Sequence, residues 1–151
     1  MPRLISLLAT CQFLLAAMAA PVSAGQPIAG PVQARVVKVH DGDSFSVEAQ
    51  VWPGTVVSVS IRVRGIDAPE MRAKCPLERY LAQQARDALA GHVSQGSIRL
   101  SNVGGDKYYG RVLADVTLSD GTDLAQALLD SRSVRPYAGK KRKGWCATLV
   151  R

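Results

Sequence analysis

The alternation of apolar and polar side chains over residues 33–65 is the feature that most constrains the fold of this chain. A period of two is typical of half-buried strands, because successive side chains of a strand point to opposite faces of the sheet. A Pro-Gly pair at residues 53–54 interrupts the pattern and predicts a turn. The sequence therefore predicts strands over residues 33–42, 44–52 and 55–65, with the last two joined as a hairpin.

The apolar period lengthens from two to helical spacing over residues 75–93, where Pro76 suits the first turn of a helix and Gly91 suits its end. Two more alternating stretches, over residues 97–103 and 110–118, predict strands, and a second helix begins after Asp123. Five strands interrupted by a helix favour an α+β, mainly β domain. We expect an OB-fold-like, five-stranded β-barrel with two helices, because closure of the barrel hides the strand edges. An open α+β sheet is the alternative.

The first 24 residues have the pattern of a secretory signal peptide. Arg3 precedes an apolar run over residues 4–20, and Val-Ser-Ala at residues 22–24 resembles a cleavage site. An uncleaved membrane anchor is the alternative, although this run is at the short limit for a membrane span. We expect cleavage after Ala24 and export to the periplasm or the medium, with no membrane association of the mature form.

The remainder has a length that suits one domain. Residues 25–32 are rich in Pro and Gly and are expected to form a linker, with the domain over residues 33–151. The chain holds 19 Lys and Arg residues against 12 Asp and Glu residues. An excess of positive charge on an exported domain favours a polyanionic partner, but it does not distinguish nucleic acid from an acidic polysaccharide or an anionic membrane.

Two cysteines, Cys75 and Cys146, remain after signal cleavage. Export implies an oxidising compartment, so the sequence predicts one disulfide between them. Two unpaired, buried thiols are the alternative.

Two acidic loops are expected to meet at one end of the predicted hairpin. With its tip at residues 53–54, the hairpin would place Asp43 opposite Arg64, and Asp67 and Glu70 follow shortly after at the same end. Three carboxylates in a small volume repel one another unless a positive charge lies between them. Oxygen ligands favour a hard cation such as calcium or magnesium. The alternative is that both loops are ordinary turn sequences.

Two arginines extend this hypothesis from metal binding to chemistry. Arg62 lies on the strand that leads to Asp67, and Arg111 begins another predicted strand. A cation together with fixed guanidinium groups can stabilise charge on a phosphoryl group during transfer. The alternatives are a solvated strand face for Arg62 and a simple strand-end charge for Arg111.

Three motifs resemble, in order, the signatures of the staphylococcal nuclease (thermonuclease) family. They are HDGDSF at residues 40–45, IRVRGIDAPE at residues 61–70 and DKYYGRVLADV at residues 106–116. The resemblance covers residues 35–137, nearly the whole expected domain. It implies a five-stranded OB-type barrel with helices and calcium-dependent hydrolysis of phosphodiester bonds in DNA and RNA, leaving 3′-phosphate ends. A non-catalytic OB-fold module that only binds nucleic acid is the alternative.

The resemblance also implies roles for individual residues. Asp43, Asp67 and the backbone carbonyl of residue 68 correspond to the calcium ligands, with Ala68 in place of the family's Thr. Glu70 corresponds to the general base that orients or deprotonates water. Arg62 and Arg111 correspond to the arginines that hold the phosphate and stabilise the transition state. Asp41 is expected to be structural.

The substrate contacts and the C-terminal segment are expected by the same resemblance. Tyr109 corresponds to a nucleotide-phosphate contact, Tyr108 stands where the type member has Lys, and Tyr137 is a candidate for stacking on a base. This chain lacks the type member's long third helix. As in short exported relatives, a bridge between Cys75 and Cys146 would substitute for it. We expect a monomer with DNA and RNA as substrates and no stable protein partner.

The basic sequence GKKRK at residues 139–143 has two interpretations. It could hold phosphates by electrostatic attraction, in which case the affinity should fall steeply with salt. It could equally be a solvated basic tail.

Overall fold

The computed structural model describes residues 25–94 and 96–146 of the chain, so the expected signal peptide lies outside the described residues. The main elements are the strands β1 (Val32–Val39), β2 (Ser44–Trp52), β3 (Thr55–Val63), β5 (Ser97–Gly105) and β6 (Arg111–Thr117), with the helices α1 (Pro76–Val93) and α2 (Leu124–Asp130). Two short strands, β4 (Ile66–Asp67) and β7 (Arg135–Pro136), complete the set. Neither described helix combines the length and apolar character needed to cross a bilayer.

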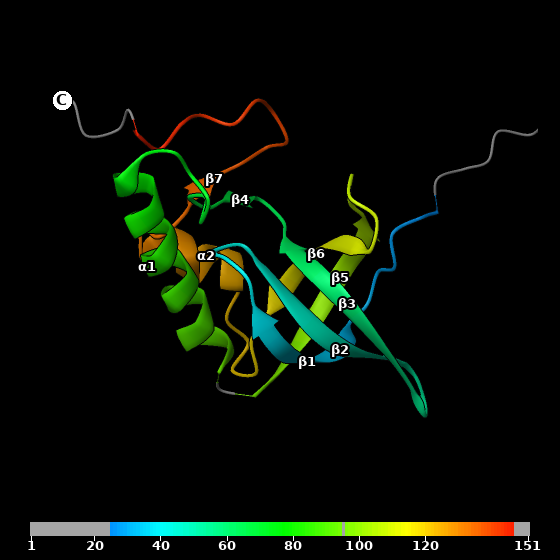
Figure 1. Cartoon of the computed structure of the whole chain (residues 1–151). Helices are drawn as coiled ribbons and strands as arrows, with labels where there is room; N and C mark the ends of the chain where they lie inside the picture. The colour runs from blue at the N-terminus through cyan, green and yellow to red at the C-terminus, as the bar shows by residue number, and fades with distance from the viewer. Residues whose placement is uncertain (1–24, 95, 147–151) are drawn as a thin grey trace, which may run out of the picture.

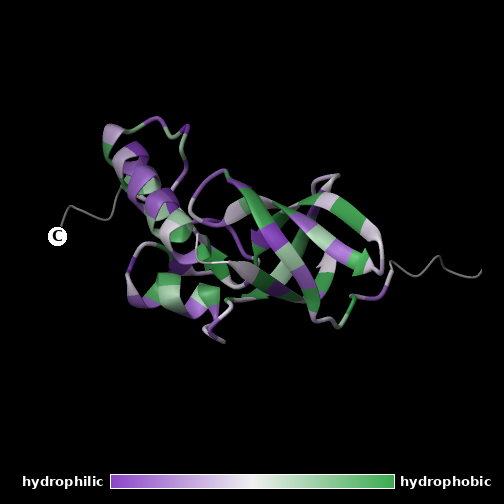
Figure 2. Ribbon diagram, turned by 90° about the horizontal axis from the view of Figure 1, so that it is seen from below, coloured by the Kyte–Doolittle hydropathy of each residue, from purple (hydrophilic) through white to green (hydrophobic). Residues whose placement is uncertain are grey.

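The five long strands close into a barrel in the order β1-β2-β3-β6-β5 (Figure 1). Strands β3 and β6 pair in parallel, and the other neighbours in the barrel are antiparallel. Apolar side chains that alternate along the strands, among them Phe45, Val47 and Ile61, point inward and are almost completely buried. Figure 2 shows the same alternation as bands of hydrophobic and hydrophilic residues along the ribbons. The predicted OB-like barrel with two helices is confirmed.

Both helices lie against one side of the barrel (Figure 1), where α1 contacts β1 and α2 contacts β6. Helix α1 starts at Pro76 and buries Ala82, Ala85 and Leu89. Helix α2 is capped by Asp123, whose carboxylate accepts a hydrogen bond from the backbone N of Gln126. Small side chains on the buried face of α1 let the helix approach the loop before β2 closely.

The register of the hairpin differs by one residue from the prediction. Ser44 pairs with Arg62 and Phe45 with Ile61, because the pairing shifts between Gln50 and Trp52, next to the turn. The prediction that Asp43 lies opposite Arg64 is therefore wrong. A bulge inserts one residue into one strand, so counting back from the tip gives the wrong partner.

The segment expected to be a linker is partly paired with the barrel. Ile28 forms an isolated antiparallel bridge with Val103, and the backbone N of Asn102 donates to the carbonyl of Ala29. At Gly30 the chain passes so close to β5 that an added Cβ would lie 2.5 Å from the carbonyl oxygen of Leu100. The Pro and Gly residues thus allow close packing here rather than a free connection.

The short sheet β4–β7 brings the C-terminal segment to the acidic loop at residues 67–70. Ile66 pairs with Pro136 and Asp67 with Arg135. Beyond β7 the chain runs over this small sheet and returns to the start of α1 (Figure 1). There a disulfide joins Cys146 to Cys75, as predicted. The crosslink and the short sheet together hold residues 137–146 above the predicted site.

Candidate active site

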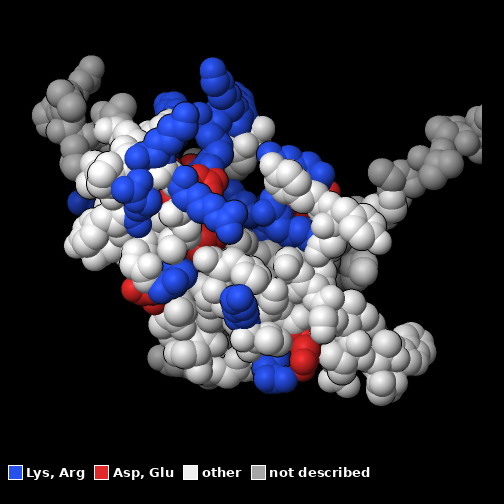
Figure 3. Space-filling model, viewed as in Figure 1, with Lys and Arg blue, Asp and Glu red and all other residues white. Residues whose placement is uncertain are grey.

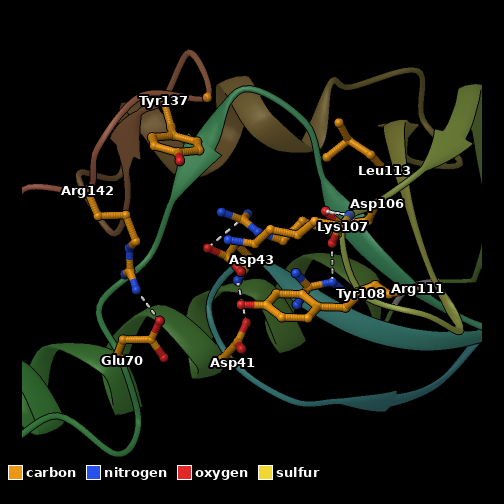
Figure 4. Close-up of a pocket in the computed structure, with 12 residues that line it drawn as sticks. Asp41, Asp43, Glu70, Asp106, Lys107, Tyr108, Arg111, Leu113, Tyr137 and Arg142 are labelled. Carbon is orange, nitrogen blue, oxygen red and sulfur yellow. Dashed lines mark hydrogen bonds and ion pairs between the residues drawn. The ribbon is translucent and has the colours of Figure 1, made fainter.

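A cavity of about 520 Å³ opens at the end of the barrel where the two acidic loops meet (Figure 4). The loop before β2, the loop after β4, the β5–β6 connection and the C-terminal segment all contribute to it. Its lining residues are Asp41, Asp43, Arg62, Glu70, Asp106, Lys107, Tyr108, Arg111, Leu113, Tyr137, Gly139 and Arg142. Side chains far apart in the sequence, from both acidic motifs and both predicted arginines, thus share one cavity.

Asp43 is buried and is held by contacts to both acidic loops. Its backbone N donates to Oδ1 of Asp41 at 3.0 Å, and Oδ1 of Asp41 also accepts from the Ser44 hydroxyl at 2.8 Å. Oδ2 of Asp43 accepts from the backbone N of Ala68 at 2.8 Å and lies 2.9 Å from Nη1 of Arg62. Asp41 therefore shapes the turn that aims Asp43 at the second loop, and it also lines the cavity.

The turn before Asp43 requires glycine at position 42. A Cβ there would lie 2.5 Å from Cβ of Ala85 on α1 and 2.9 Å from Cβ of Ala68. Both distances are shorter than any normal carbon–carbon contact, and neither neighbour can rotate its Cβ away. Gly42 thus lets the two acidic loops and α1 meet without a side chain between them.

The environment of Asp43 favours its neutral form. Burial, the largest cause, raises the pKa of this carboxyl, Arg62 and the Ala68 N–H lower it, and the nearby Asp41 raises it, so that the net pKa is about 7. Ionisation of Asp43 therefore has a free-energy cost that a cation bound beside it would offset.

Asp67 is also buried, and basic and indole groups surround its carboxylate. Nε of Arg142 donates to its Oδ1, and Nε1 of Trp145 lies 3.3 Å and Nη2 of Arg135 lies 3.5 Å from its Oδ2. The same Arg142 donates through Nη2 to the carbonyl of Ala68 at 2.6 Å and through Nη1 to the carboxylate of Glu70. Figure 4 shows Arg142 reaching toward Glu70 at one side of the cavity.

Sequence reasoning did not find this role of Arg142. In the sequence, Arg142 is one of several basic residues at positions 139–143, and the positive charge of that segment is the only feature that suggests a functional role. Asp67 and Ala68 themselves do not line the cavity, whereas Arg142 lines it and contacts both of them.

Arg62 and Arg111 come from the neighbouring strands β3 and β6 and have different partners. Arg62 donates through Nη2 to the carbonyl of Ile66 at 2.9 Å and through Nη1 to the carbonyl of Val63 at 3.2 Å, so the loop it serves also fixes its position. Arg111 forms an ion pair with Asp106, and its guanidinium carbon lies 4.7 Å from the centre of the Tyr108 ring.

Asp106 is a lining residue that the sequence analysis did not single out, although it lies within the third motif. Burial alone would raise its pKa. The hydrogen bond from the backbone N of Lys107 and the ion pair with Arg111 outweigh burial and lower the pKa instead. Asp106 is therefore a charged partner that orients Arg111.

The structure brings two of the three predicted tyrosines into the cavity. Tyr108 and Tyr137 line it, and the backbone N of Tyr137 donates to the carbonyl of Gly65. Tyr109 is fully exposed and does not line the cavity. Arg64, the residue expected opposite Asp43, instead donates to the Asp115 carboxylate on β6.

The donor set of this site fits a hard divalent cation. Asp43, Asp67, Glu70 and the carbonyl of Ala68 offer oxygen atoms, which calcium and magnesium prefer. A guanidinium already bridges three of these groups, which shows that they converge on a position suited to positive charge. In the described residues, the group of side chains whose ligand atoms all lie within 4.8 Å of one another is Cys75, Glu78 and Cys146. It does not fit, because its two sulfurs are bonded to each other. The carboxylates of Asp43, Asp67 and Glu70 do not all lie that close to one another in this structure.

Comparison with protein families gives a match to the staphylococcal nuclease homologues over residues 60–141. A search of curated proteins returned no match. The matched segment is more than half of the 151-residue chain and contains Arg62, Glu70 and Arg111. The first motif, residues 40–45, precedes the matched segment. The contacts of Asp43 with Arg62 and Ala68 place this motif at the same site. Motifs, barrel and family match agree, and the chain belongs to the family of staphylococcal nuclease homologues.

Proposed function

We propose that this protein is a calcium-dependent nuclease that hydrolyses phosphodiester bonds in DNA and RNA and leaves 3′-phosphate ends. One observation carries the proposal: Asp43 and Glu70, from two distant acidic loops, share one open cavity with the two predicted arginines. The backbone of Ala68 contacts Asp43 at its edge. A polyanionic substrate also agrees with the basic side chains that surround the cavity (Figure 3).

The metal ligands would be Asp43, Asp67 and the backbone carbonyl of Ala68. When bound, a calcium ion would supply Lewis-acid activation of the phosphate and offset the negative charge that develops on it. The replacement of Thr by Ala at position 68 leaves the carbonyl ligand in place, because that ligand belongs to the backbone.

The side chains of the cavity would divide the remaining work. Glu70 would orient a water molecule and accept its proton as the water attacks phosphorus in line with the leaving 5′ oxygen. Arg62 and Arg111 would donate hydrogen bonds to the phosphoryl oxygens as their charge increases. Their fixed positions matter, because donors that need no reorganisation stabilise a transition state more than mobile ones.

The setting of the enzyme is part of the proposal. Residues 1–24 would direct export and be removed, leaving a monomeric enzyme that acts on DNA and RNA in the periplasm or the medium. The disulfide agrees with an oxidising compartment.

The experiment that tests the proposal compares the parent protein with Glu70→Gln on plasmid DNA and on single-stranded RNA, with calcium or with a chelator. We expect the parent to cleave both substrates in calcium and to leave ends that a 3′-phosphatase must treat before extension. Glu70→Gln should lose at least about a hundredfold in rate, because it keeps the shape of the side chain but not the base. Binding of nucleic acid by the parent without cleavage would favour the non-catalytic module instead.

A further inference from the structure

Arg142 contacts the same oxygen atoms that the proposed cation would need. Its guanidinium donates to the carboxylate of Asp67, to the carbonyl of Ala68 and to the carboxylate of Glu70. The first two groups are the proposed metal ligands of the second acidic loop, and the third is the proposed base. One side chain from the C-terminal segment therefore donates hydrogen bonds to three acceptor groups of the second acidic loop.

The chain on the C-terminal side of Arg142 is fastened to the domain at several points. Cys146 is bonded to Cys75 at the start of α1, and the buried Trp145 donates to Asp67. The guanidinium of Arg135 lies over the Trp145 ring at 3.7 Å and donates to the carbonyl of Lys143 at 2.8 Å. Arg142 thus lies next to a fixed segment rather than on a free tail.

We propose that Arg142 is a specificity-determining residue of the metal site, which competes with the divalent cation for Asp67 and Ala68. This inference rests on the proposed calcium site and deepens it. A cation needs direct contact with these oxygens at about 2.3–2.6 Å, which leaves no room for a donated hydrogen bond along the same direction. Two positive groups so close also repel each other. The guanidinium must therefore withdraw when the ion binds.

The competition lowers the apparent affinity of the site and stabilises its metal-free form. When only a fraction of the protein is in the binding-competent state, the measured dissociation constant equals the intrinsic one divided by that fraction. In the metal-free protein Arg142 keeps two carboxylates together that would otherwise repel each other. Once the ion is bound, Arg142 is released beside the cavity, where its charge faces a phosphate.

The experiment measures calcium binding by isothermal titration calorimetry in the absence of nucleic acid. The variants are Arg142→Gln, Arg142→Lys and the control Lys38→Gln, which removes the same charge from an exposed residue that lines neither cavity of the site. We expect Arg142→Gln to bind calcium roughly tenfold more tightly than the parent, within the usual range of coupling between two ligands. The calcium affinity of Arg142→Lys should lie between those of the parent and Arg142→Gln, since an ammonium keeps the charge but lacks the planar fork of donors. Lys38→Gln should change the affinity less than about twofold, because it loses only a screened surface charge.

Thermal unfolding separates competition from a merely structural role. With chelator, Arg142→Gln should unfold at a lower temperature than the parent. With saturating calcium, the difference should largely vanish. A structural role would lower the unfolding temperature equally under both conditions, and that result would overturn the inference.

Reduction of the disulfide tests whether the Cys75–Cys146 bond holds Arg142 close to the carboxylates. The effective concentration of Arg142 at the carboxylates falls when Cys146 is released. Calcium affinity should therefore rise on reduction of the parent and stay constant on reduction of Arg142→Gln. An equal change in both proteins would contradict a tethered competitor.

The outcomes distinguish this inference from the proposed function. Equal calcium affinity in the parent and in Arg142→Gln overturns the competition and leaves the nuclease proposal intact. Absence of calcium binding in both proteins overturns the calcium site and the competition with it. Binding that is detected only in Arg142→Gln supports both.

Discussion

Asp43 combines burial with a position where a charge is needed. Its carboxyl has lost most of its water, and its partners in the described residues, Arg62 and the backbone N of Ala68, compensate only part of that loss. This is why its pKa rises to about 7 while its function, as proposed, requires the ionised form. A cation bound beside Asp43 would offset the free-energy cost of ionising this buried carboxyl.

The raised pKa of Asp43 predicts a pH dependence of the metal-free protein. The carboxyl binds its proton more tightly in the folded state, where the pKa is about 7, than in the unfolded state, where it is near the ordinary 3.8. Its contribution to stability is therefore fully present below pH 3.8 and is lost as pH rises toward 7, by at most about 4 kcal/mol. Chemical denaturation with chelator at pH 5 and pH 8 measures the part of this change that falls between those pH values, at most about 3 kcal/mol.

Asp43→Asn is the control for this prediction, because it keeps an acceptor for the Ala68 N–H but cannot ionise. As pH rises from 5 to 8, the unfolding free energy of the parent should fall relative to that of Asp43→Asn. If that difference stays constant over this range, Asp43 ionises normally in the folded protein and the explanation given for its pKa is wrong.

At the scale of elements, the site depends on close approach between the loop before β2, the loop after β4 and helix α1. Gly42, Ala68 and Ala85 meet at this point, and each lacks atoms beyond Cβ. The small buried side chains of α1 therefore serve the geometry of the acidic loops as well as the packing of the helix.

Gly42→Ala tests this three-element contact. The new Cβ would overlap the Cβ atoms of Ala85 and Ala68, so we expect a loss of about 1–3 kcal/mol in unfolding free energy and weaker calcium binding. Denaturant unfolding and calorimetry give the two readouts. The matched control is Gly91→Ala on α1, where a Cβ meets nothing within 4 Å and a small gain in stability is expected. Unchanged stability and calcium affinity in Gly42→Ala would show that the loops do not pack as described.

At the scale of the whole molecule, positive charge is concentrated around the open end of the barrel. Figure 3 shows Lys and Arg side chains gathered there around a few acidic side chains. Lys140, Lys141 and Lys143 line a second cavity of about 440 Å³, which shares Tyr137 with the first. An electrostatic track for a polynucleotide could thus run from the cavity along the C-terminal segment.

Neutralising this track should reduce the salt dependence of nucleic-acid binding. We expect replacement of Lys140, Lys141 and Lys143 by Gln to reduce the slope of log affinity against log salt by about 2, as for three phosphate contacts to single strands. Fluorescence anisotropy with the Glu70→Gln protein in chelator measures binding without cleavage. The control replaces Arg35, Lys38 and Arg99, which lie away from the cavity. An equal change of slope in both triple variants would mean that only net charge matters.

Much of this protein was determined by local patterns in its sequence. Alternation with a period of two specified the barrel strands, helical spacing specified α1, and the three motifs identified the carboxylates and arginines. The register of the hairpin could also have been read from alternation, since inward-facing Phe45 must pair with inward-facing Ile61. Counting from the turn missed it because the bulge between Gln50 and Trp52 leaves no clear local signal.

The position of Arg142 was decided only by the tertiary structure. Nothing near residue 142 distinguishes this arginine from the lysines beside it, and its partners Asp67 and Glu70 lie more than 70 positions earlier in the chain. The β4–β7 pairing, the buried Trp145 and the disulfide act together to bring it there. Sequence patterns report which face a side chain takes on its own element, whereas contacts between distant segments depend on how the whole chain packs.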